Sequence, residues 1–315
     1  MRKIITIGES VLDTIFKDNV PMKSFVGGRV ANAACSLALS GLETLMVSEC
    51  ANDHVGDIIV DFLKSNKVDV TSVDRYVNGT TAFSAIFESD NHEPQLVNYG
   101  TYPPDRFDVV WPRINEDDIV LFGSLYSIEN QQRSRLYEIL QYAADRKAIM
   151  VYLPGFQHGI NYSITKVMPN VLENFELSNV VIASNRDIHD IFPRETGEQA
   201  YRNHMIYCNC LMHVTDDLST TVYGRGTAAP IEQPSNALGN ALGWQAGYTA
   251  GIIYGMVAAD LRHKTIANTD AQTWVQIAKG AYAFAEECAA SATNCVSHEF
   301  AKQKARELAK ILATE

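Results

Sequence analysis

The sequence predicts an α/β protein in which a mainly parallel sheet lies between two layers of helices, with a small β structure added to it. Short apolar runs that are typical of buried strands alternate with helical stretches of about ten or more residues. Such alternation indicates a parallel sheet that is covered on both faces. Of the 315 residues, 46% are hydrophobic and 20% charged, so we expect a large buried core and no extensive disorder.

Six apolar runs are expected to form the main sheet, at residues 4–7, 45–48, 119–122, 149–153, 180–183 and 211–215. The helices expected between them cover residues 31–40, 55–65, 131–146 and 199–206. The last third is expected to be mainly helical, over residues 243–261, 273–290 and 298–314. In the first of these helices, a spacing of four residues predicts one apolar stripe made of Trp244, Tyr248, Ile252 and Met256.

Two pairs of short segments interrupt this alternation. Residues 13–17 and 23–26 have the pattern of short strands, and residues 80–89 and 95–100 have that of a hairpin around a polar turn. A small antiparallel sheet of this kind commonly covers a ligand cleft or pairs with a second subunit. We therefore expect a single domain, residues 1–315, whose lid is formed by about residues 11–26 and 80–100 and joins a homodimer.

Charge and missing motifs argue against several classes of protein. The net charge of −11 does not suit a general nucleic-acid or membrane surface. The first strand ends in Gly8-Glu-Ser rather than a dinucleotide fingerprint, and the P-loop pattern and the G-x-S-x-G elbow do not occur. The chain starts without a signal-peptide pattern, and no apolar run approaches the ~20 residues that span a bilayer. These observations predict a cytoplasmic protein with no nucleic-acid or membrane partner.

Cysteine and histidine spacing does not predict a metal centre. The six cysteines form no C-x-x-C pair, so we expect reduced, structural thiols. The nearest candidate cluster is His204, Cys208, Cys210 and His213. Packing of a helix against the following strand explains this cluster more simply than a bound metal.

Four sequence segments occur in an order and with a spacing that few unrelated proteins would share. They are GESVLD at residues 8–13, VGGRVANAACSLALSGL at 26–42, VGDIIVDFLKSNKVD at 55–69 and SNALGNALGWQAGY at 235–248. Together they resemble the PfkB/ribokinase family of carbohydrate kinases, which includes the fructokinases, and the resemblance covers nearly the whole chain. It implies a ribokinase-like three-layer αβα sandwich with a small β lid, and the activity of that family is the transfer of phosphate from Mg·ATP to a sugar.

The resemblance implies that Asp13, Gly27, Gly28 and Asn32 bind the hydroxyls of a sugar or polyol. A carboxylate can accept two hydroxyl hydrogen bonds, and glycines let the backbone approach a ligand. The residues alone leave an alternative open, in which the two glycines only form a tight turn and the aspartate lies at the surface. Four aromatic residues are further candidates for the cleft wall, with core or lid packing as the alternative: Tyr99, Tyr102, Trp111 and Tyr126.

The fourth segment lies where the family usually has D-T-x-G-A-G-D-x-F-x-A-G. In this register Gly239, Asn240 and Ala241 replace the Gly-Ala-Gly anion hole, and Leu242 takes the place of the catalytic aspartate. Leucine accepts no proton, and loss of a general base slows a reaction by about 10²–10⁴-fold. Ala241 also replaces a glycine at a position where we expect the backbone to need φ > 0, which alanine adopts reluctantly. Apolar packing at a helix N-terminus explains Leu242 without a catalytic role.

Two other catalytic segments depart from the family pattern in the same direction. Leu153 and Gly155 lie where a D-x-N segment is usual. Residues 184–192 resemble the family's N-x-x-E segment, which orders magnesium and phosphate. Asn185 matches the asparagine of that segment, but Ile188 takes the place of its glutamate. Asp187, one residue away, is a possible substitute metal ligand.

The turn that lies beside ATP in the family is altered as well. Asp217 and Thr220 replace its usual glycines, and the added negative charge opposes nucleotide binding. Changes at the base, anion hole, magnesium segment and nucleotide turn together point to the loss of one activity.

Three functions therefore remain open. The one we favour is a sugar-binding relative with impaired or absent phosphoryl transfer, which would need no cofactor. The second is an active sugar kinase that uses Mg and ATP with a rearranged base, drawn from Asp187, Asp216 or Asp217. The third is a non-catalytic interaction protein, in which the lid serves mainly as an interface.

Overall fold

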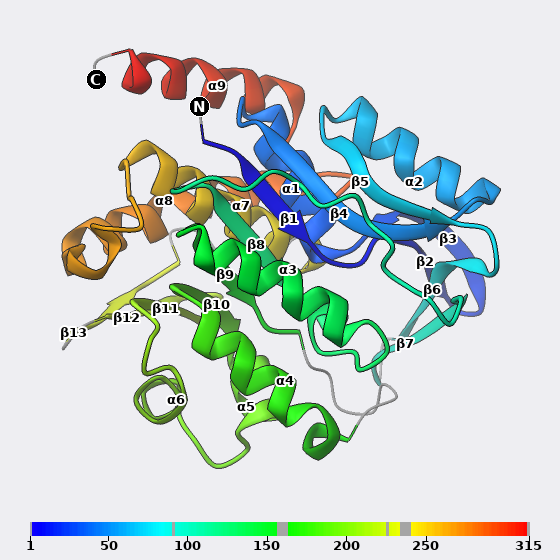
Figure 1. Ribbon diagram of the computed structural model, residues 1–315, viewed down its shortest axis with the longest axis horizontal. Coiled ribbons are helices and arrows are strands. Elements are labelled where there is room, and N and C mark those ends of the chain that lie inside the picture. The colour runs from blue at the N-terminus through cyan, green and yellow to red at the C-terminus, as the bar shows by residue number, and fades with distance from the viewer. Residues whose placement is uncertain (1, 90–91, 156–162, 225–226, 234–240, 314–315) are drawn as a thin grey trace.

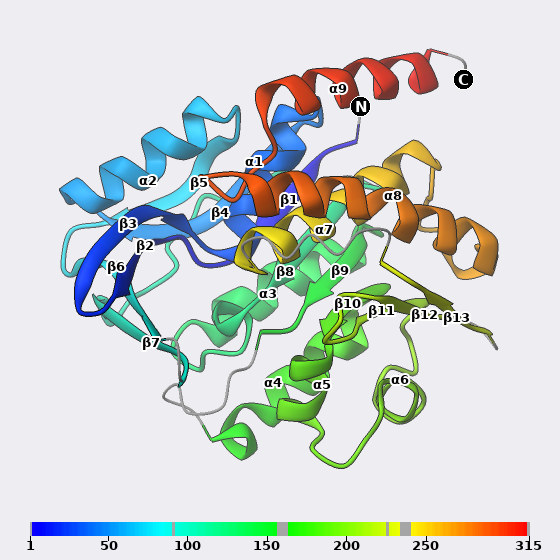
Figure 2. The same cartoon turned by 180° about the vertical axis from the view of Figure 1, so that it is seen from behind.

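The computed structural model describes residues 2–89, 92–155, 163–224, 227–233 and 241–313, and their strands form two sheets (Figures 1 and 2). Two residues of the expected anion hole, Gly239 and Asn240, lie outside the described residues. Ala241 and Leu242 begin a helix, but their side chains are not described.

The large sheet has nine strands in the order β13-β12-β11-β10-β9-β8-β1-β4-β5. They are β1 (Ile4–Ile7), β4 (Thr44–Ala51), β5 (Asp69–Tyr76), β8 (Ile119–Gly123), β9 (Ile149–Leu153), β10 (Val180–Ser184), β11 (Cys210–Val214), β12 (Thr220–Gly224) and β13 (Thr227–Ile231). Neighbouring strands from β11 to β5 are parallel, whereas β12 and β13 pair antiparallel at one edge. Every residue of β1, β8 and β9 is buried, as expected for parallel strands covered on both faces.

Helices cover both faces of this sheet and confirm the three-layer sandwich. One face, nearer the viewer in Figure 2, carries α1 (Arg29–Leu39), α2 (His54–Ser65), α7 (Ala241–Ala258), α8 (Ala271–Ala290) and α9 (His298–Leu312). The other face, nearer the viewer in Figure 1, carries α3 (Arg133–Asp145), α4 (Ile164–Leu177), α5 (Asn185–Ile191) and α6 (Gly197–His204). The predicted stripe of α7 is buried at all four positions, Trp244, Tyr248, Ile252 and Met256.

The segments expected to form the lid make a separate sheet of four strands in the order β3-β2-β6-β7, called the small sheet below. Its strands are β2 (Val11–Lys17), β3 (Val20–Gly27), β6 (Thr80–Ser89) and β7 (His92–Thr101). The expectation of purely antiparallel pairing was wrong, because β2 and β6 are parallel. Each of them follows the carboxyl end of a strand of the large parallel sheet, β1 and β5, and so they leave it in the same direction.

No helix in the described part of the chain combines the length and the apolar character that crossing a bilayer demands.

Candidate functional site

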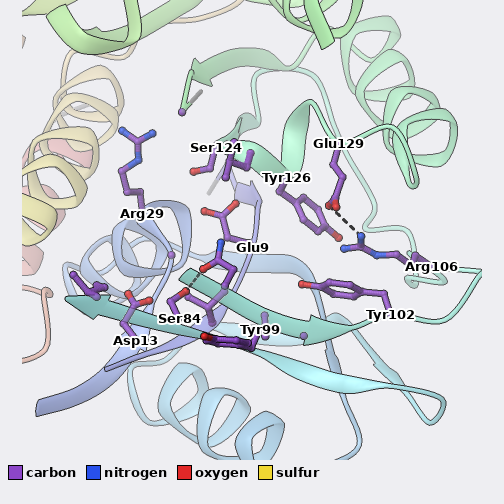
Figure 3. Close-up of a pocket in the computed structure, with 18 of the residues that line it drawn as sticks. Glu9, Asp13, Arg29, Ser84, Tyr99, Tyr102, Arg106, Ser124, Tyr126 and Glu129 are labelled. Carbon is purple, nitrogen blue, oxygen red and sulfur yellow. Dashed lines mark hydrogen bonds and ion pairs between the residues drawn. The ribbon is translucent and has the colours of Figure 1, made fainter. Parts of the chain in front are cut away.

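A cavity of about 300 Å³, called the main cavity, lies where the carboxyl ends of β1 and β8 meet the small sheet (Figure 3). From β1 the chain continues to β4 and β5 on one side of the sheet, and it returns to β8 on the other side. Ligands of open α/β sheets bind at the carboxyl ends of strands where the order reverses in this way. Glu9 follows β1 and Ser124 follows β8, and both line the main cavity.

Asp13 projects from β2 into the main cavity and is 8% exposed. Its neighbour on β6 in the register of the small sheet is Ser84. Burial raises the pKa of Asp13 to about 7, the nearby Glu9 adds to the rise, and the Ser84 hydroxyl opposes it. Near neutral pH the Asp13 carboxyl group is therefore present both with and without its proton, and it can pair with the hydroxyls of a ligand in either form.

Close contacts with the cavity wall require glycine at two positions, Gly27 at the end of β3 and Gly28 just before α1. A Cβ atom on Gly27 would lie 1.9 Å from Asp13 Oδ2, so only glycine lets that carboxyl group lie against the backbone. Gly28 has φ +100, and a Cβ atom there would lie 2.4 Å from the backbone oxygen of Glu9. Gly28 is also the residue that precedes α1, so the same glycine starts the helix and leaves space for Glu9.

The four expected sugar-binding residues therefore differ in their position relative to the main cavity. Asp13 and Gly28 line the main cavity, and Gly27 lies directly behind Asp13. Asn32 is buried in α1, with its Oδ1 atom 3.8 Å from the Sγ atom of Cys295, and it is not among the described residues that line the cavity.

Three of the four candidate aromatic residues, Tyr99, Tyr102 and Tyr126, line the main cavity. Tyr126 is 3% exposed, whereas Tyr99 is 57% exposed on the small sheet. Trp111 instead packs on Tyr142, with 5.5 Å between the ring centroids, and is not among the described lining residues.

A buried ion-pair network closes one end of the main cavity. Arg106, 3% exposed, donates from Nε to Glu49 Oε1 at 2.9 Å, and its Nη1 atom lies 3.0 Å from Glu129 Oε2. Its guanidinium carbon lies 3.5 Å from the centroid of the Tyr102 ring. Burial alone would lower the pKa of Arg106, but the charge and hydrogen bonds of Glu49 together with the charge of Glu129 raise this pKa above its ordinary value. Since Glu49 also accepts from the backbone N–H of Phe107, three hydrogen bonds hold its carboxylate.

Several polar residues of the main cavity were missed in the sequence analysis. They are Glu9, Arg29, Ser84, Asn98, Arg106, Ser124, Glu129 and Gln245. Two of them carry a signal that the sequence does contain, because Glu9 and Ser124 come within two residues of the ends of predicted parallel strands. Arg29 and Gln245 lie in the segments at 26–42 and 235–248 that carry the family resemblance, whereas Arg106 and Glu129 reach the cavity only through tertiary packing.

Arg29 lies between the main cavity and a second cavity of only about 20 Å³. Its Nη1 atom donates to Gln245 Oε1 at 3.0 Å, and its Nη2 atom donates to the backbone oxygen of Pro154 at 2.8 Å. The second cavity is lined by Leu153 and Trp244, among others, and Trp244 is 1% exposed. Large apolar side chains thus occupy much of this side of the cleft.

The described residues on this side do not fit a magnesium–nucleotide site. Asp187 lines the second cavity, but one of its carboxylate oxygens accepts hydrogen bonds from the backbone and hydroxyl of Ser184 and caps α5. Burial raises the pKa of Asp187. Asn185 donates to Asp216 Oδ2 at 2.8 Å. Asp217 accepts hydrogen bonds from the Thr215 hydroxyl and the Ser219 backbone N–H in a turn at the surface. Across the described ranges, no three His, Cys, Asp or Glu residues gather as a metal-binding group.

The members of the His/Cys cluster contact other partners. His204 Nε2 lies 3.0 Å from Glu195 Oε1. Cys208 donates from Sγ to the backbone oxygen of Cys210 at 3.0 Å. Burial lowers the pKa of His213.

The fold defines a class of α/β protein whose main cavity lies at the carboxyl ends of β1 and β8, beneath a small β sheet. The family model described as pfkB family carbohydrate kinase matches residues 1–204. The chain belongs to this family of carbohydrate kinases.

Relatives of known identity agree with this assignment. The ATP-dependent 6-phosphofructokinase of Thermoanaerobacterium thermosaccharolyticum is 22% identical over 205 residues, which are 62% of this chain and 62% of that protein. The match therefore spans less than two thirds of the length of this curated relative.

Solved structures show that the resemblance of the fold extends over nearly the whole chain. The fructokinase of Vibrio cholerae, solved with fructose, ADP and potassium, superposes with a TM-score of 0.80 at 13% identity and covers 95% of both chains. The aminoimidazole riboside kinase of Salmonella enterica, solved with aminoimidazole riboside and an ATP analogue, has a TM-score of 0.77 at 13% identity and covers 98% of this chain and 100% of its own.

Proposed function

We propose that this protein binds a sugar or polyol in the main cavity and that its ATP-dependent phosphoryl transfer is impaired or absent. The observation that carries the proposal is the contrast between the two cavities. The main cavity, at about 300 Å³, has the size and the polar lining that suit a small polyhydroxy compound. The second cavity, toward the expected phosphate side, has about 20 Å³.

Asp13 supports the sugar-binding part of the proposal. Its carboxyl group is buried and faces the main cavity, and Gly27 leaves it the space that a Cβ atom would fill. A ligand with neighbouring hydroxyls would satisfy this group, which otherwise loses hydration on burial.

Residues on the phosphate side support the second part. Leu153, buried at the carboxyl end of β9, supplies no charge where the family usually has an aspartate. Trp244 stacks on Tyr248 with 5.0 Å between ring centroids, and the Tyr248 hydroxyl lies 2.8 Å from Thr220 Oγ1. This aromatic packing and the leucine at position 242 offer nothing that activates a sugar hydroxyl.

The alternative of an active kinase with a rearranged base has less support. Asp187 is engaged with Ser184, and Asp216 and Asp217 are exposed and do not line either of these cavities. A base must come within hydrogen-bond reach of the hydroxyl that it deprotonates.

Replacing Leu242 by Asp is expected to leave turnover far below the ordinary kinase rate of about 1–100 s⁻¹. The new carboxylate restores the base, but the anion hole and the magnesium segment remain altered. ADP release would be measured with Mg·ATP and a panel of sugars, with Leu242→Asn as the matched variant that adds polarity without a base. A rate within the ordinary range from Leu242→Asp alone would contradict the proposal that several catalytic elements are lost.

A further inference from the structure

Two cations, Arg29 and Arg106, occur among the described residues that line the main cavity, and they differ in their partners. Arg106 is paired with the carboxylates of Glu49 and Glu129, so its charge is already neutralised. Arg29 instead donates to two neutral oxygens, and within the described part of the chain it forms no ion pair with a carboxylate. The charge of Arg29 is therefore available to a ligand of this cavity.

Hydrogen bonds to two different elements hold Arg29 at one end of the main cavity. In Figure 3 it lies on the same side as Asp13, whereas Arg106 lies toward the other end. The Nη1 atom of Arg29 donates to Gln245 on α7 at 3.0 Å, and its Nη2 atom donates to Pro154, just after β9, at 2.8 Å. These contacts use two of the five N–H groups of a guanidinium, so the others remain for a ligand.

Gly155 provides the space that Arg29 occupies. A Cβ atom at position 155 would lie 2.4 Å from Arg29 Nη2 and 2.6 Å from the Cα atom of Ser124. Position 155 is the one at which the family usually has an asparagine, so the guanidinium group lies where that side chain would begin. A positive charge thus replaces a neutral side chain in the wall of the main cavity.

The carboxyl groups around Arg29 do not cancel its charge. Glu9 in the main cavity and Asp187 in the second cavity are the carboxyl groups whose titration Arg29 affects. Burial raises the pKa of both, although the charge of Arg29 opposes the rise. Burial also raises the pKa of Asp13, to about 7, and Glu129 is already engaged in an ion pair. Near neutral pH these groups therefore carry less free negative charge than exposed carboxylates would.

We propose that Arg29 binds an anionic group, a carboxylate or a phosphate, of a polyhydroxy ligand and so makes the main cavity selective for sugar acids or sugar phosphates. The inference rests on the proposed sugar binding and names the class of sugar. The planar guanidinium matches the oxygen atoms of both anions with paired hydrogen bonds. The helix α1 begins at Arg29, and the positive end of its dipole favours an anion at the same place.

The first test compares neutral and anionic probes by calorimetry: glucose with glucuronate, and fructose with fructose 1-phosphate and fructose 6-phosphate. We expect at least one anionic probe to bind about tenfold or more tightly than its neutral counterpart. Whether the carboxylate or a phosphate gains shows which anion Arg29 takes. If every neutral sugar binds as tightly as its anionic counterparts, the inference is overturned while the proposed sugar binding stands. If no probe binds, the proposed sugar binding fails and the inference fails with it.

The second test removes the charge of Arg29. Arg29→Gln should weaken binding of the preferred anion by about tenfold or more and change that of the neutral sugar by less than about twofold. Arg29→Lys should keep part of the preference, because it keeps the charge but loses the paired geometry. Arg186→Gln, exposed on α5 and not among the lining residues, is the matched control and should change neither affinity. Unchanged anion affinity in Arg29→Gln would overturn the inference.

A third variant keeps Arg29 in place and occupies its charge instead. Gln245→Glu is nearly isosteric and puts a carboxylate where the amide oxygen now lies 3.0 Å from Arg29 Nη1. It should also weaken binding of the anion by about tenfold or more, with less than about a twofold change for the neutral sugar. Loss of anion binding in Arg29→Gln but not in Gln245→Glu would mean that the arginine acts only through packing, which would contradict the proposed role.

Discussion

Replacing Asp13 by Ala is expected to weaken sugar binding by about 100-fold or more, to the limit of detection by calorimetry. The carboxyl group is buried in the wall of the main cavity and can make two hydrogen bonds to ligand hydroxyls. Hydrogen bonds to a charged group contribute about 1.5–3 kcal/mol each, and each 1.4 kcal/mol corresponds to a factor of ten.

The same variant is not expected to unfold the protein, which separates a binding role from a structural one. Burial raises the pKa of Asp13 from its ordinary 3.8 to about 7. Between these values the folded state holds a proton that the unfolded state has released, so this group makes the protein less stable as pH rises from about 4 to 7. Asp13→Ala should remove that decline, as measured by urea unfolding at several pH values. Wild-type affinity in Asp13→Ala would place the sugar elsewhere.

Replacing Gly28 by Ala is expected to lower the free energy of unfolding by about 2–4 kcal/mol. An L-residue at φ +100 is strained, and its Cβ atom would lie 2.4 Å from the backbone oxygen of Glu9, which cannot move without distorting the end of β1. Because Glu9 and α1 both border the main cavity, sugar binding should fall together with stability.

Gly280→Ala is the matched control for this prediction. Gly280 lies in α8, and a Cβ atom there would meet nothing within 4 Å. Alanine is preferred over glycine inside helices, so this variant should be up to about 1 kcal/mol more stable. Urea unfolding of both variants gives the comparison. Equal stability of Gly28→Ala and the wild type would show that the close contact with Glu9 does not constrain the site.

Much of the large sheet could be predicted because its strands are buried on both faces. The predicted bounds of β1 (Ile4–Ile7) and β9 (Ile149–Leu153) agree with the structure, since parallel strands in a covered sheet are continuous apolar runs. β5 (Asp69–Tyr76) was missed because it lies at the edge and carries charged residues. α4 (Ile164–Leu177) was missed as well, and its sequence contains Pro169, which normally argues against a helix interior.

The candidate site could be predicted in part, through the aromatic candidates Tyr99, Tyr102 and Tyr126 and through residues of the family motifs that are close in sequence. The GESVLD and VGGRVAN segments led to Asp13, Gly27 and Gly28, which the structure places at or behind the cavity wall. Arg106 could not be found in this way, because its partner Glu49 is 57 residues away and the pair forms only in the folded chain. The same holds for the convergence of Tyr126 on Glu9, which depends on the pairing of β8 with β1.

Thermal unfolding with and without ligands tests most directly whether the protein keeps a sugar site but has lost phosphoryl transfer. The protein would be heated with Mg·ATP alone, with each sugar of a panel alone, and with both together. A ligand at about 100 times its Kd stabilises the folded state by roughly 2.7 kcal/mol, which shifts the melting temperature measurably. We predict a shift with at least one uncharged sugar and no further shift when Mg·ATP is added. Stabilisation by Mg·ATP, alone or on top of the sugar, would contradict this account and indicate a working kinase.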